Sequence, residues 1–248
     1  MTTPRTVLIT GSGRGIGRAM ALALARVGHA VAVQDMEVIA AEAVVAEIAQ
    51  RGGRAEAFGG DVTDPALPEQ LYSEVHRRLG PPDILINNAA VQEAVAWDQA
   101  SPERLQWQWR GNVLTPWMLT RLCAPHMRQQ RWGRVLFLSS IEARRGNPGM
   151  LGYSTTKAAV NNLVTGLAAA LGPDGITVNA ISPGYFDTHR NRDDFPDEAT
   201  KQRRGQWLPL RRVGEPEDVV GLTLLLTSDR GSYITGQVIP VDGGMSIR

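Results

Sequence analysis

The chain has 248 residues, 43% of them hydrophobic and 21% charged, and its formal net charge is +1. This composition is typical of a globular protein, and the near-neutral charge provides no general attraction to nucleic acid or to a membrane surface. No apolar run approaches the roughly 18 residues of a membrane span, the start MTTPRTVLIT is unlike a signal peptide, and the single cysteine, Cys123, excludes an intrachain disulfide. We therefore expect a cytoplasmic protein with no nucleic-acid partner and no membrane partner.

Short runs rich in valine, isoleucine and leucine alternate with longer stretches of helical periodicity. The predicted strands are residues 6–10, 30–34, 55–59, 84–87, 134–139, 177–182 and 237–241. The predicted helices are residues 16–27, 38–51, 66–79, 102–128, 152–171 and 216–227. Most strand segments lack polar alternation, which indicates strands covered on both faces, and their alternation with helices indicates βαβ crossovers. The sequence therefore predicts the α/β class, with a doubly wound parallel sheet in a single domain, residues 1–248.

One stretch departs from this regular pattern. Residues 185–213 are polar, rich in arginine and aspartate, and only weakly periodic. A long irregular insertion in a compact domain usually forms a binding loop or a lid. We predict a substrate lid there.

A glycine-rich turn, TGSGRGIG (residues 10–17), joins the first predicted strand to the first predicted helix. Glycines permit positive φ and let the backbone approach a pyrophosphate, which then lies at the helix N-terminus. Many such turns are plain turns, but this position in a βαβ unit favours nucleotide binding. The candidate cofactor-binding residues of the turn are Gly11, Ser12, Arg14, Gly15, Ile16 and Gly17.

Asp35 follows the second predicted strand, 18 residues after Gly17. An acid near this spacing can accept hydrogen bonds from the adenosine ribose hydroxyls and repel the 2′-phosphate of NADP. The alternative is a solvated acid that opens the next loop, and Arg14 argues the other way because it could hold a 2′-phosphate. We predict NAD, since an anion there would still meet the charge of Asp35. After the third strand, Asp61 and Val62 are further candidates, with Asp61 able to reach the adenine amino group.

Polar residues follow later strands in a fixed order. The fourth strand ends in NNAA, which contains Asn88 and Ala89, and the fifth ends at Ser139 and Ser140. The segment YSTTK then places Tyr153 and Lys157 four residues apart, on one face of a helix. An isolated pair of this kind is usually a solvated helix face, so its meaning depends on the other motifs.

Taken in order, TGSGRGIG, NNAA, Asn112, Ser140, YSTTK, SPGYFDT and the closing VDGG resemble the short-chain dehydrogenase/reductase family along nearly the whole chain. The one departure is NNAA, where the family usually has NNAG. The resemblance implies a Rossmann-type fold with a seven-stranded sheet and helices on both faces, and a homotetramer. It also implies a catalytic tetrad of Asn112, Ser140, Tyr153 and Lys157, and cofactor contacts from Asn88, Ala89, Tyr153, Lys157, Pro183, Gly184 and Thr188.

The implied tetrad meets a chemical requirement. Removing the hydroxyl proton of a secondary alcohol needs a base, and a free tyrosine with a pKa of about 10 is a poor one near neutral pH. Lowering that pKa by about three units takes about 4 kcal/mol. An ammonium roughly 5 Å away supplies about 3 kcal/mol at an effective dielectric near 20, and a nicotinamide cation can add the rest. In this scheme Ser140 orients the substrate oxygen and Asn112 anchors a water that links Lys157 to solvent.

The substrate is less well specified. Glu142, Arg144 and Arg145 follow the catalytic serine, where members of the family line the substrate pocket, and His189 and Arg190 lie in the predicted lid. Arginine forks bind carboxylate or phosphate well, but a solvated lid with internally paired arginines is an equal alternative. The leading hypothesis is an NAD-dependent dehydrogenase of a small hydrophilic substrate, such as a sugar, polyol or anionic sugar acid. The alternatives are an NADPH-dependent 3-oxoacyl-thioester reductase and a catalytically silent dinucleotide sensor, against which the intact tetrad speaks. No metal ligand is expected.

Overall fold

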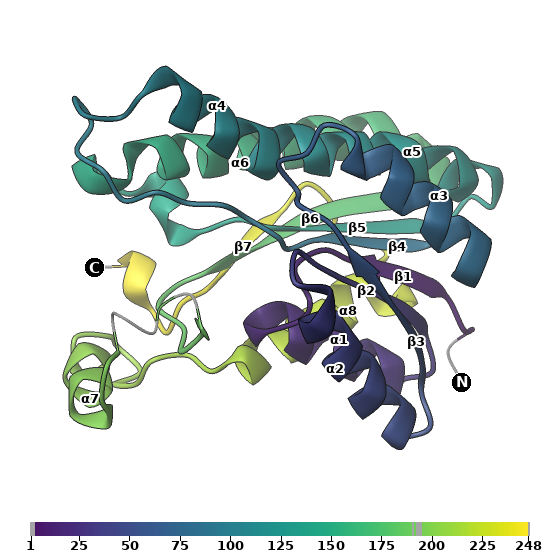
Figure 1. The fold of residues 1–248 in the computed structure, drawn as a ribbon, viewed down its shortest axis with the longest axis horizontal. Helices are drawn as coiled ribbons and strands as arrows, with labels where there is room; N and C mark the ends of the chain where they lie inside the picture. Colours follow the sequence, from purple (N-terminus) through teal and green to yellow (C-terminus); the bar gives the residue numbers. More distant parts are fainter. Residues whose placement is uncertain (1–2, 190, 192–194, 248) are drawn as a thin grey trace.

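The computed structural model describes residues 3–189, 191 and 195–247, and their strands form one parallel sheet of seven strands in the order β3-β2-β1-β4-β5-β6-β7 (Figure 1). The strands are β1 (Thr6–Ile9), β2 (Ala30–Asp35), β3 (Arg54–Gly59), β4 (Ile84–Asn87), β5 (Gly133–Leu138), β6 (Ile176–Pro183) and β7 (Val238–Val241). Each lies within two residues of its predicted position. The doubly wound Rossmann-type fold is therefore confirmed.

Helices cover both faces of the sheet (Figure 1). One layer holds α3 (Leu67–Leu79), α5 (Thr115–Gln129) and α6 (Leu151–Leu171), and the other holds α1 (Gly15–Arg26), α2 (Val38–Gln50) and α8 (Val220–Leu226). Successive residues of β1 alternate between the two cores, since Leu8 packs in the first while Val7 and Ile9 pack in the second. All three are fully buried, which explains the continuous apolar runs in the sequence.

The strand order reverses next to β1. β2 and β3 lie on one side of β1, and β4 to β7 lie on the other. At such a switch point the loops after neighbouring strands run in opposite directions and leave a crevice at the carboxyl ends of the strands. The topology therefore places the glycine-rich turn and the ends of β4, β5 and β6 around one opening.

The predicted helix 102–128 is interrupted. It consists of α4 (Pro102–Trp109), a π-helical turn at Arg110–Leu114, and α5. In the π turn the Thr115 N–H bonds to the carbonyl of Arg110, five residues back. Pro116 has no N–H and cannot give the carbonyl of Asn112 its α-helical hydrogen bond. π turns of this kind are frequent at functional sites, and this one contains Asn112.

The predicted lid contains a helix that the sequence pattern did not indicate, α7 (Glu198–Gln206). Asp197 caps its N-terminus by accepting a hydrogen bond from the Thr200 N–H at 2.6 Å. Only Gly205 is buried within α7, so the helix has no apolar stripe to give a periodic signal. Figure 1 shows α7 apart from the two helical layers.

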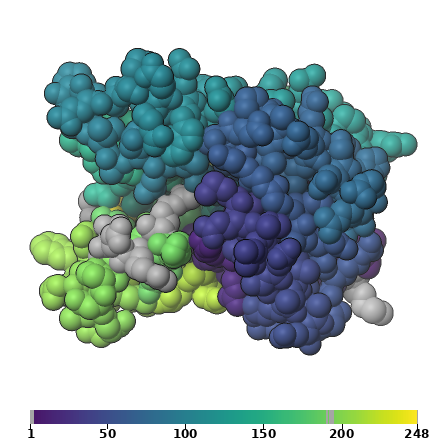
Figure 2. Space-filling view, in the orientation of Figure 1, coloured from purple at the N-terminus to yellow at the C-terminus, as the bar shows by residue number. Residues whose placement is uncertain are grey.

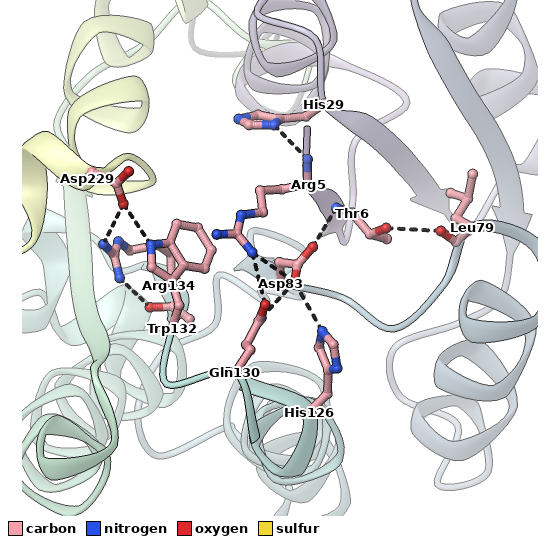
Figure 3. Close-up of polar contacts among 11 residues, drawn as sticks. Arg5, Thr6, His29, Leu79, Asp83, His126, Gln130, Trp132, Arg134 and Asp229 are labelled. Atoms are coloured by element: carbon pink, nitrogen blue, oxygen red, sulfur yellow. Dashed lines mark hydrogen bonds and ion pairs between the residues drawn. The ribbon is translucent and has the colours of Figure 1, made fainter. Parts of the chain in front are cut away.

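A polar network fills the opposite, amino-terminal edge of the sheet (Figure 3). Asp83 accepts hydrogen bonds from the Thr6 N–H at 2.9 Å and from Gln130 at 2.6 Å. The same carboxylate lies 3.1 Å from His126 and 3.6 Å from Arg5. These contacts join the start of β1 to the end of α5 and the loop before β4.

Candidate active site

A cavity of about 730 Å³ lies at the carboxyl edge of the sheet. Its lining comes from the segments that follow β1 to β6. In Figure 2 the surface is hollowed between the teal residues around α4 and the green residues around α7, beside the purple N-terminal segment. The crevice expected from the strand order is therefore an open cavity.

The glycine-rich turn is packed too tightly for side chains. Gly11 and Gly15 have φ of +63° and +51°, in the left-handed region that favours glycine. A Cβ on Gly17 would lie 2.3 Å from the Gly11 carbonyl oxygen. Asn88 fixes the turn by donating hydrogen bonds to the carbonyls of Thr10 and Gly11, at 2.9 and 2.7 Å. This packing brings the main chain of the turn to the cavity surface.

The N-terminus of α1 opens toward the same cavity. No side chain caps it, because its N-cap residue, Arg14, makes no cap hydrogen bond. Gly15, Ile16 and Gly17 of the first turn all line the cavity. Uncapped N–H groups together with the helix dipole favour an anion. These residues therefore fit the pyrophosphate of a dinucleotide.

Asp35 lies where the adenosine end of a dinucleotide would reach. It lines the cavity, and its carboxylate accepts hydrogen bonds from the Gly13 N–H at 3.0 Å and the Glu37 N–H at 3.2 Å. Arg14 forms an ion pair with Glu37, which holds the pKa of that glutamate below its usual range. Among the described residues, this corner therefore brings together the carboxylates of Asp35 and Glu37 and the guanidinium of Arg14. Gly60 and the two residues that follow it, Asp61 and Val62, also line the cavity.

Three members of the predicted tetrad meet at the cavity. Ser140, Tyr153 and Lys157 all line it, and the Tyr153 and Lys157 residues are only 7% and 3% exposed. The ammonium of Lys157 lies 5.6 Å from the centroid of the Tyr153 ring and donates a 2.7 Å hydrogen bond to the carbonyl of Leu138. Because α6 places the two residues one turn apart, the cation and the phenol occupy one face.

Ser140 is oriented by the turn that follows it. Its Oγ accepts a 3.1 Å hydrogen bond from the Glu142 N–H and so caps the 3₁₀ turn Ile141–Arg144. With its oxygen used as an acceptor, the hydroxyl hydrogen can be donated to a substrate oxygen.

Asn112, the fourth member, lies behind the cavity wall rather than on it. Its side chain bonds to both the N–H and the carbonyl of Val91, each at 2.8 Å, and to Thr156 Oγ1 at 3.0 Å. These three bonds join the π turn to the strand-4 loop and to α6. The side-chain amide is thus committed to protein groups.

The other predicted residues divide into two groups. Ala89, Pro183, Gly184, Thr188, Glu142 and His189 line the cavity. Ser12 does not, because it is fully buried and its Oγ donates to the Ile9 carbonyl at 2.8 Å. Arg144 and Arg145 are exposed outside the cavity, and Arg145 lies 3.4 Å from Glu142. Arg190 lies outside the described residues.

The cavity also includes residues that the sequence motifs did not indicate. Gln34 accepts a 3.2 Å hydrogen bond from the Gly11 N–H and donates a 2.7 Å bond to the Gly60 carbonyl. The sequence feature that could have indicated Gln34 is its polar side chain at the end of an otherwise apolar strand. The additional lining residues on the substrate side are Gln92, Asn147, Met150, Tyr185 and Asn191. They lie in loops and short 3₁₀ turns, where no periodic pattern distinguishes them.

Among the described residues, no group of three or more His, Cys, Asp or Glu side chains could hold a metal ion. No helix in the part of the chain that the structure describes is long and apolar enough to cross a membrane.

Comparison with known proteins agrees with the fold. The family model described as Enoyl-(Acyl carrier protein) reductase matches residues 11–246. The chain therefore belongs to the short-chain dehydrogenase/reductase family, as its motifs predicted.

Particular relatives differ in their substrates. The chain is 36% identical to the 3-oxoacyl-[acyl-carrier-protein] reductase FabG of Aquifex aeolicus, over 96% of each chain. It is 34% identical to the L-rhamnose 1-dehydrogenase (NAD(P)(+)) of a Sphingomonas species, over 98% of this chain and 96% of that one. The structure of a gluconate 5-dehydrogenase from Burkholderia cenocepacia with NADP and tartrate matches with a TM-score of 0.90 at 31% identity, covering 98% and 96% of the two chains. The protein is thus an oxidoreductase of CH–OH groups with a nicotinamide dinucleotide cofactor.

Proposed function

We propose that the protein is an NAD-dependent dehydrogenase that interconverts a secondary alcohol and a ketone, or a hemiacetal and a lactone. The substrate is small and hydrophilic, such as a sugar, a polyol or a sugar acid. The observation that carries this proposal is the meeting of Ser140, Tyr153 and Lys157 on one cavity beside the glycine-rich turn.

Tyr153 is the general base in this proposal. The nearby ammonium of Lys157 stabilises a phenolate, by about 3 kcal/mol for charges roughly 5 Å apart at an effective dielectric near 20. Ser140 donates its hydroxyl hydrogen to the substrate oxygen and holds it beside the phenol. Asn112 acts indirectly, because its bonds to Val91 and Thr156 fix the wall behind these groups. A water held near the Asn112 carbonyl would pass the proton from Lys157 toward solvent.

The cofactor would be held by the glycine-rich turn and the loops around it. Its pyrophosphate fits the uncapped N-terminus of α1, and Thr188 lies beside Gly15 of that turn. Pro183 and Gly184, at the end of β6, line the same cavity. When bound, the nicotinamide ring accepts or supplies the hydride. The glycine-rich turn and the loops after the later strands line one continuous cavity, as the binding of an extended dinucleotide requires.

NAD is favoured over NADP by the charges at the adenosine corner. Among the described residues, Asp35 and the adjacent Glu37 carry two negative charges there, and Arg14 carries one positive charge. A 2′-phosphate would meet both carboxylates, and Arg14 is already paired with Glu37. The ribose hydroxyls of NAD would instead donate hydrogen bonds to Asp35.

The hypothesis that the substrate carries an anionic group is less well supported by the structure than by the sequence. It relied on Arg144 and Arg145 beside the catalytic serine, and both lie outside the cavity. Hydrophilic character retains support, because Gln92, Glu142 and Asn147 line the substrate side.

We also propose self-association as a homotetramer. Four large apolar side chains of the α4–α5 region are 40% to 43% exposed, namely Leu105, Trp109, Leu114 and Trp117. The neighbouring α6 exposes the small residues Ala158, Ala169 and Ala170, which permit close helix approach. Light scattering at micromolar concentration should report a tetramer, or at least a dimer, and a monomer would contradict this proposal. A cytoplasmic location remains a proposal, which the single buried thiol suits.

The runner-up function is an NADPH-dependent 3-oxoacyl-thioester reductase, which the similarity to FabG supports. Arg14 would then turn from Glu37 to a 2′-phosphate. The third hypothesis, a catalytically silent dinucleotide sensor, would leave the cofactor bound without turnover.

One experiment separates the three functions. Reduced cofactor is followed with neutral sugars, polyols, sugar acids and hydroxyacyl thioesters, each with NAD and with NADP. We expect turnover of a hydrophilic alcohol, with kcat/KM at least roughly tenfold higher for NAD, and a loss of that preference in Asp35→Ser. Highest activity on a thioester with NADP would establish the runner-up, and cofactor binding without turnover on any class would favour the sensor.

A further inference from the structure

Glu142 places a carboxylate on the substrate side of the cavity, two residues after Ser140. Its side chain is 14% exposed, in contrast to Arg144 and Arg145, which are exposed. The backbone of the same residue donates the hydrogen bond that orients Ser140 Oγ. The 3₁₀ turn Ile141–Arg144 therefore places a carboxylate in the cavity wall, two residues after the serine whose hydroxyl would hold the reacting oxygen.

Asn147 holds this carboxylate in place. Its Oδ1 accepts a 3.1 Å hydrogen bond from the Gly149 N–H, which sets the orientation of the amide. Its Nδ2 then donates to Glu142 Oε2 at 3.2 Å. An amide nitrogen carries two hydrogens, and only one is used in this bond. Both side chains line the cavity, so the pair offers carboxylate acceptors and an amide donor side by side.

A partly buried carboxylate is costly unless its oxygens receive hydrogen bonds. Within the described residues, its partners are Asn147 and, at 3.4 Å, Arg145, whose side chain is 49% exposed. Each carboxylate oxygen can accept about two hydrogen bonds, which leaves acceptor positions for a ligand. A hydroxyl fits this pair well, because it donates to the carboxylate and accepts from the amide. A methylene or a second carboxylate fits it poorly.

Resting on the proposed function, we infer that Glu142 and Asn147 form a subsite for a hydroxyl group next to the reacting carbon. The substrate is therefore a vicinal diol or polyol rather than an isolated alcohol. A 3-hydroxyacyl thioester has methylene groups on both sides of its alcohol carbon and would leave the carboxylate without a donor. The subsite recognises the neighbouring hydroxyl and not the net charge of the substrate.

The test compares alcohols that differ only in that hydroxyl. Cyclohexanol is compared with the cyclohexanediol that has adjacent hydroxyls, and a polyol is compared with its deoxy form. We expect kcat/KM to be roughly 10- to 100-fold higher for the diol, the range for a hydrogen bond to a charged group. In Glu142→Gln and Asn147→Ser the ratio of kcat/KM for the diol to kcat/KM for the isolated alcohol should shrink to within a fewfold, mainly through KM for the diol.

Two controls separate this subsite from general damage. Glu93→Gln removes a carboxylate that pairs with Arg104 and is not among the cavity-lining residues, so it should keep the diol preference. Arg145→Gln removes the outer partner of Glu142 without removing a cavity group, and should keep the preference too. The thermal midpoint of each variant is measured beside its kinetics to show that it is folded.

Each outcome decides one of the two proposals. Oxidation of alcohols with no diol preference, or a preference that survives in both Glu142→Gln and Asn147→Ser, overturns the subsite and leaves the dehydrogenase function standing. Turnover of no alcohol with either dinucleotide overturns the proposed function itself. A diol preference that disappears in these variants and persists in Glu93→Gln supports the inference.

Discussion

The two edges of the sheet use polar residues in opposite ways. At the carboxyl edge, glycines keep side chains out, and the groups of Ser140 and Glu142 that face the cavity retain hydrogen-bonding capacity for a ligand. At the amino edge, Asp83 is bonded or paired with four surrounding groups of the protein (Figure 3). The first arrangement brings closely packed main chain to the cavity surface and keeps polar groups available to a ligand. The second joins neighbouring elements through hydrogen bonds and an ion pair. Substitutions at the two edges should therefore separate activity from stability.

The amino edge also buries a cation. The Arg134 side chain is 3% exposed, and burial lowers the pKa of its guanidinium. It donates hydrogen bonds to the carbonyls of Ser228 and Gly133, at 3.1 and 2.8 Å. The guanidinium groups of Arg134 and Arg5 both lie over the Trp132 ring, 4.3 and 4.0 Å from its centroid. Favourable cation–π contacts and carbonyl acceptors thus replace water around these charges.

The largest effect is expected at the carboxyl edge, in Tyr153→Phe. Only the phenol oxygen is lost, so kcat should fall roughly 10³-fold, the scale of general base catalysis, while NADH affinity and the thermal midpoint change little. Tyr72→Phe, a half-buried tyrosine of α3 that does not line the cavity, is the matched control. Steady-state kinetics and fluorescence titration with NADH measure both effects. A phenylalanine variant with most of its activity would show that the base lies elsewhere.

The next effect is expected at the amino edge, in Asp83→Ala. The carboxylate is 12% exposed, lies 3.6 Å from Arg5 and contacts the ring of His126. Removing one partner of a largely buried ion pair costs about 3 kcal/mol, because the remaining charge of Arg5 loses its counterion. Urea unfolding should show this loss, with kcat/KM unchanged well below the thermal midpoint. In Asp229→Ala, where the carboxylate is 86% exposed, the loss should stay below about 1 kcal/mol. Equal losses in the two variants would remove the contrast between buried and exposed charge.

The sequence predicted the strands and the candidate tetrad, but not the π turn, the positions of the two arginines or the network at the amino edge. The strands were predictable because burial on both faces requires continuous apolar runs, and the tetrad because its motifs occur in a fixed order. The π turn was missed, although Pro116, four residues after Asn112, was a signal for it. The positions of Arg144 and Arg145 outside the cavity depend on the path of one short turn, which no residue pattern specifies. The amino-edge network joins residues up to 125 positions apart, as in the bond from Arg5 to Gln130.

The smallest effect is a pH dependence of stability at His29, beside the same network. His29 is 7% exposed, and its Nδ1 accepts a hydrogen bond from the Arg5 N–H at 3.2 Å, which requires the neutral ring. Burial, and to a lesser extent the charge of Arg5, lowers the pKa of His29, while Asp83 opposes this shift.

The direction of this pH effect follows from the lowered pKa. Below about pH 6.5 the unfolded chain takes up a proton at this histidine that the folded chain resists, so stability present above that pH is lost as the pH falls. The slope cannot exceed about 1.4 kcal/mol per pH unit for one proton. Urea unfolding at about pH 7.5 and about pH 5.5 should therefore show a loss about 1 kcal/mol larger in the native protein than in His29→Gln, which does not titrate. His76→Gln, a change at an exposed histidine of α3, should keep the native pH dependence. If His29→Gln kept it too, His126 beside Asp83 would be the group to substitute next, because its ring also contacts the network.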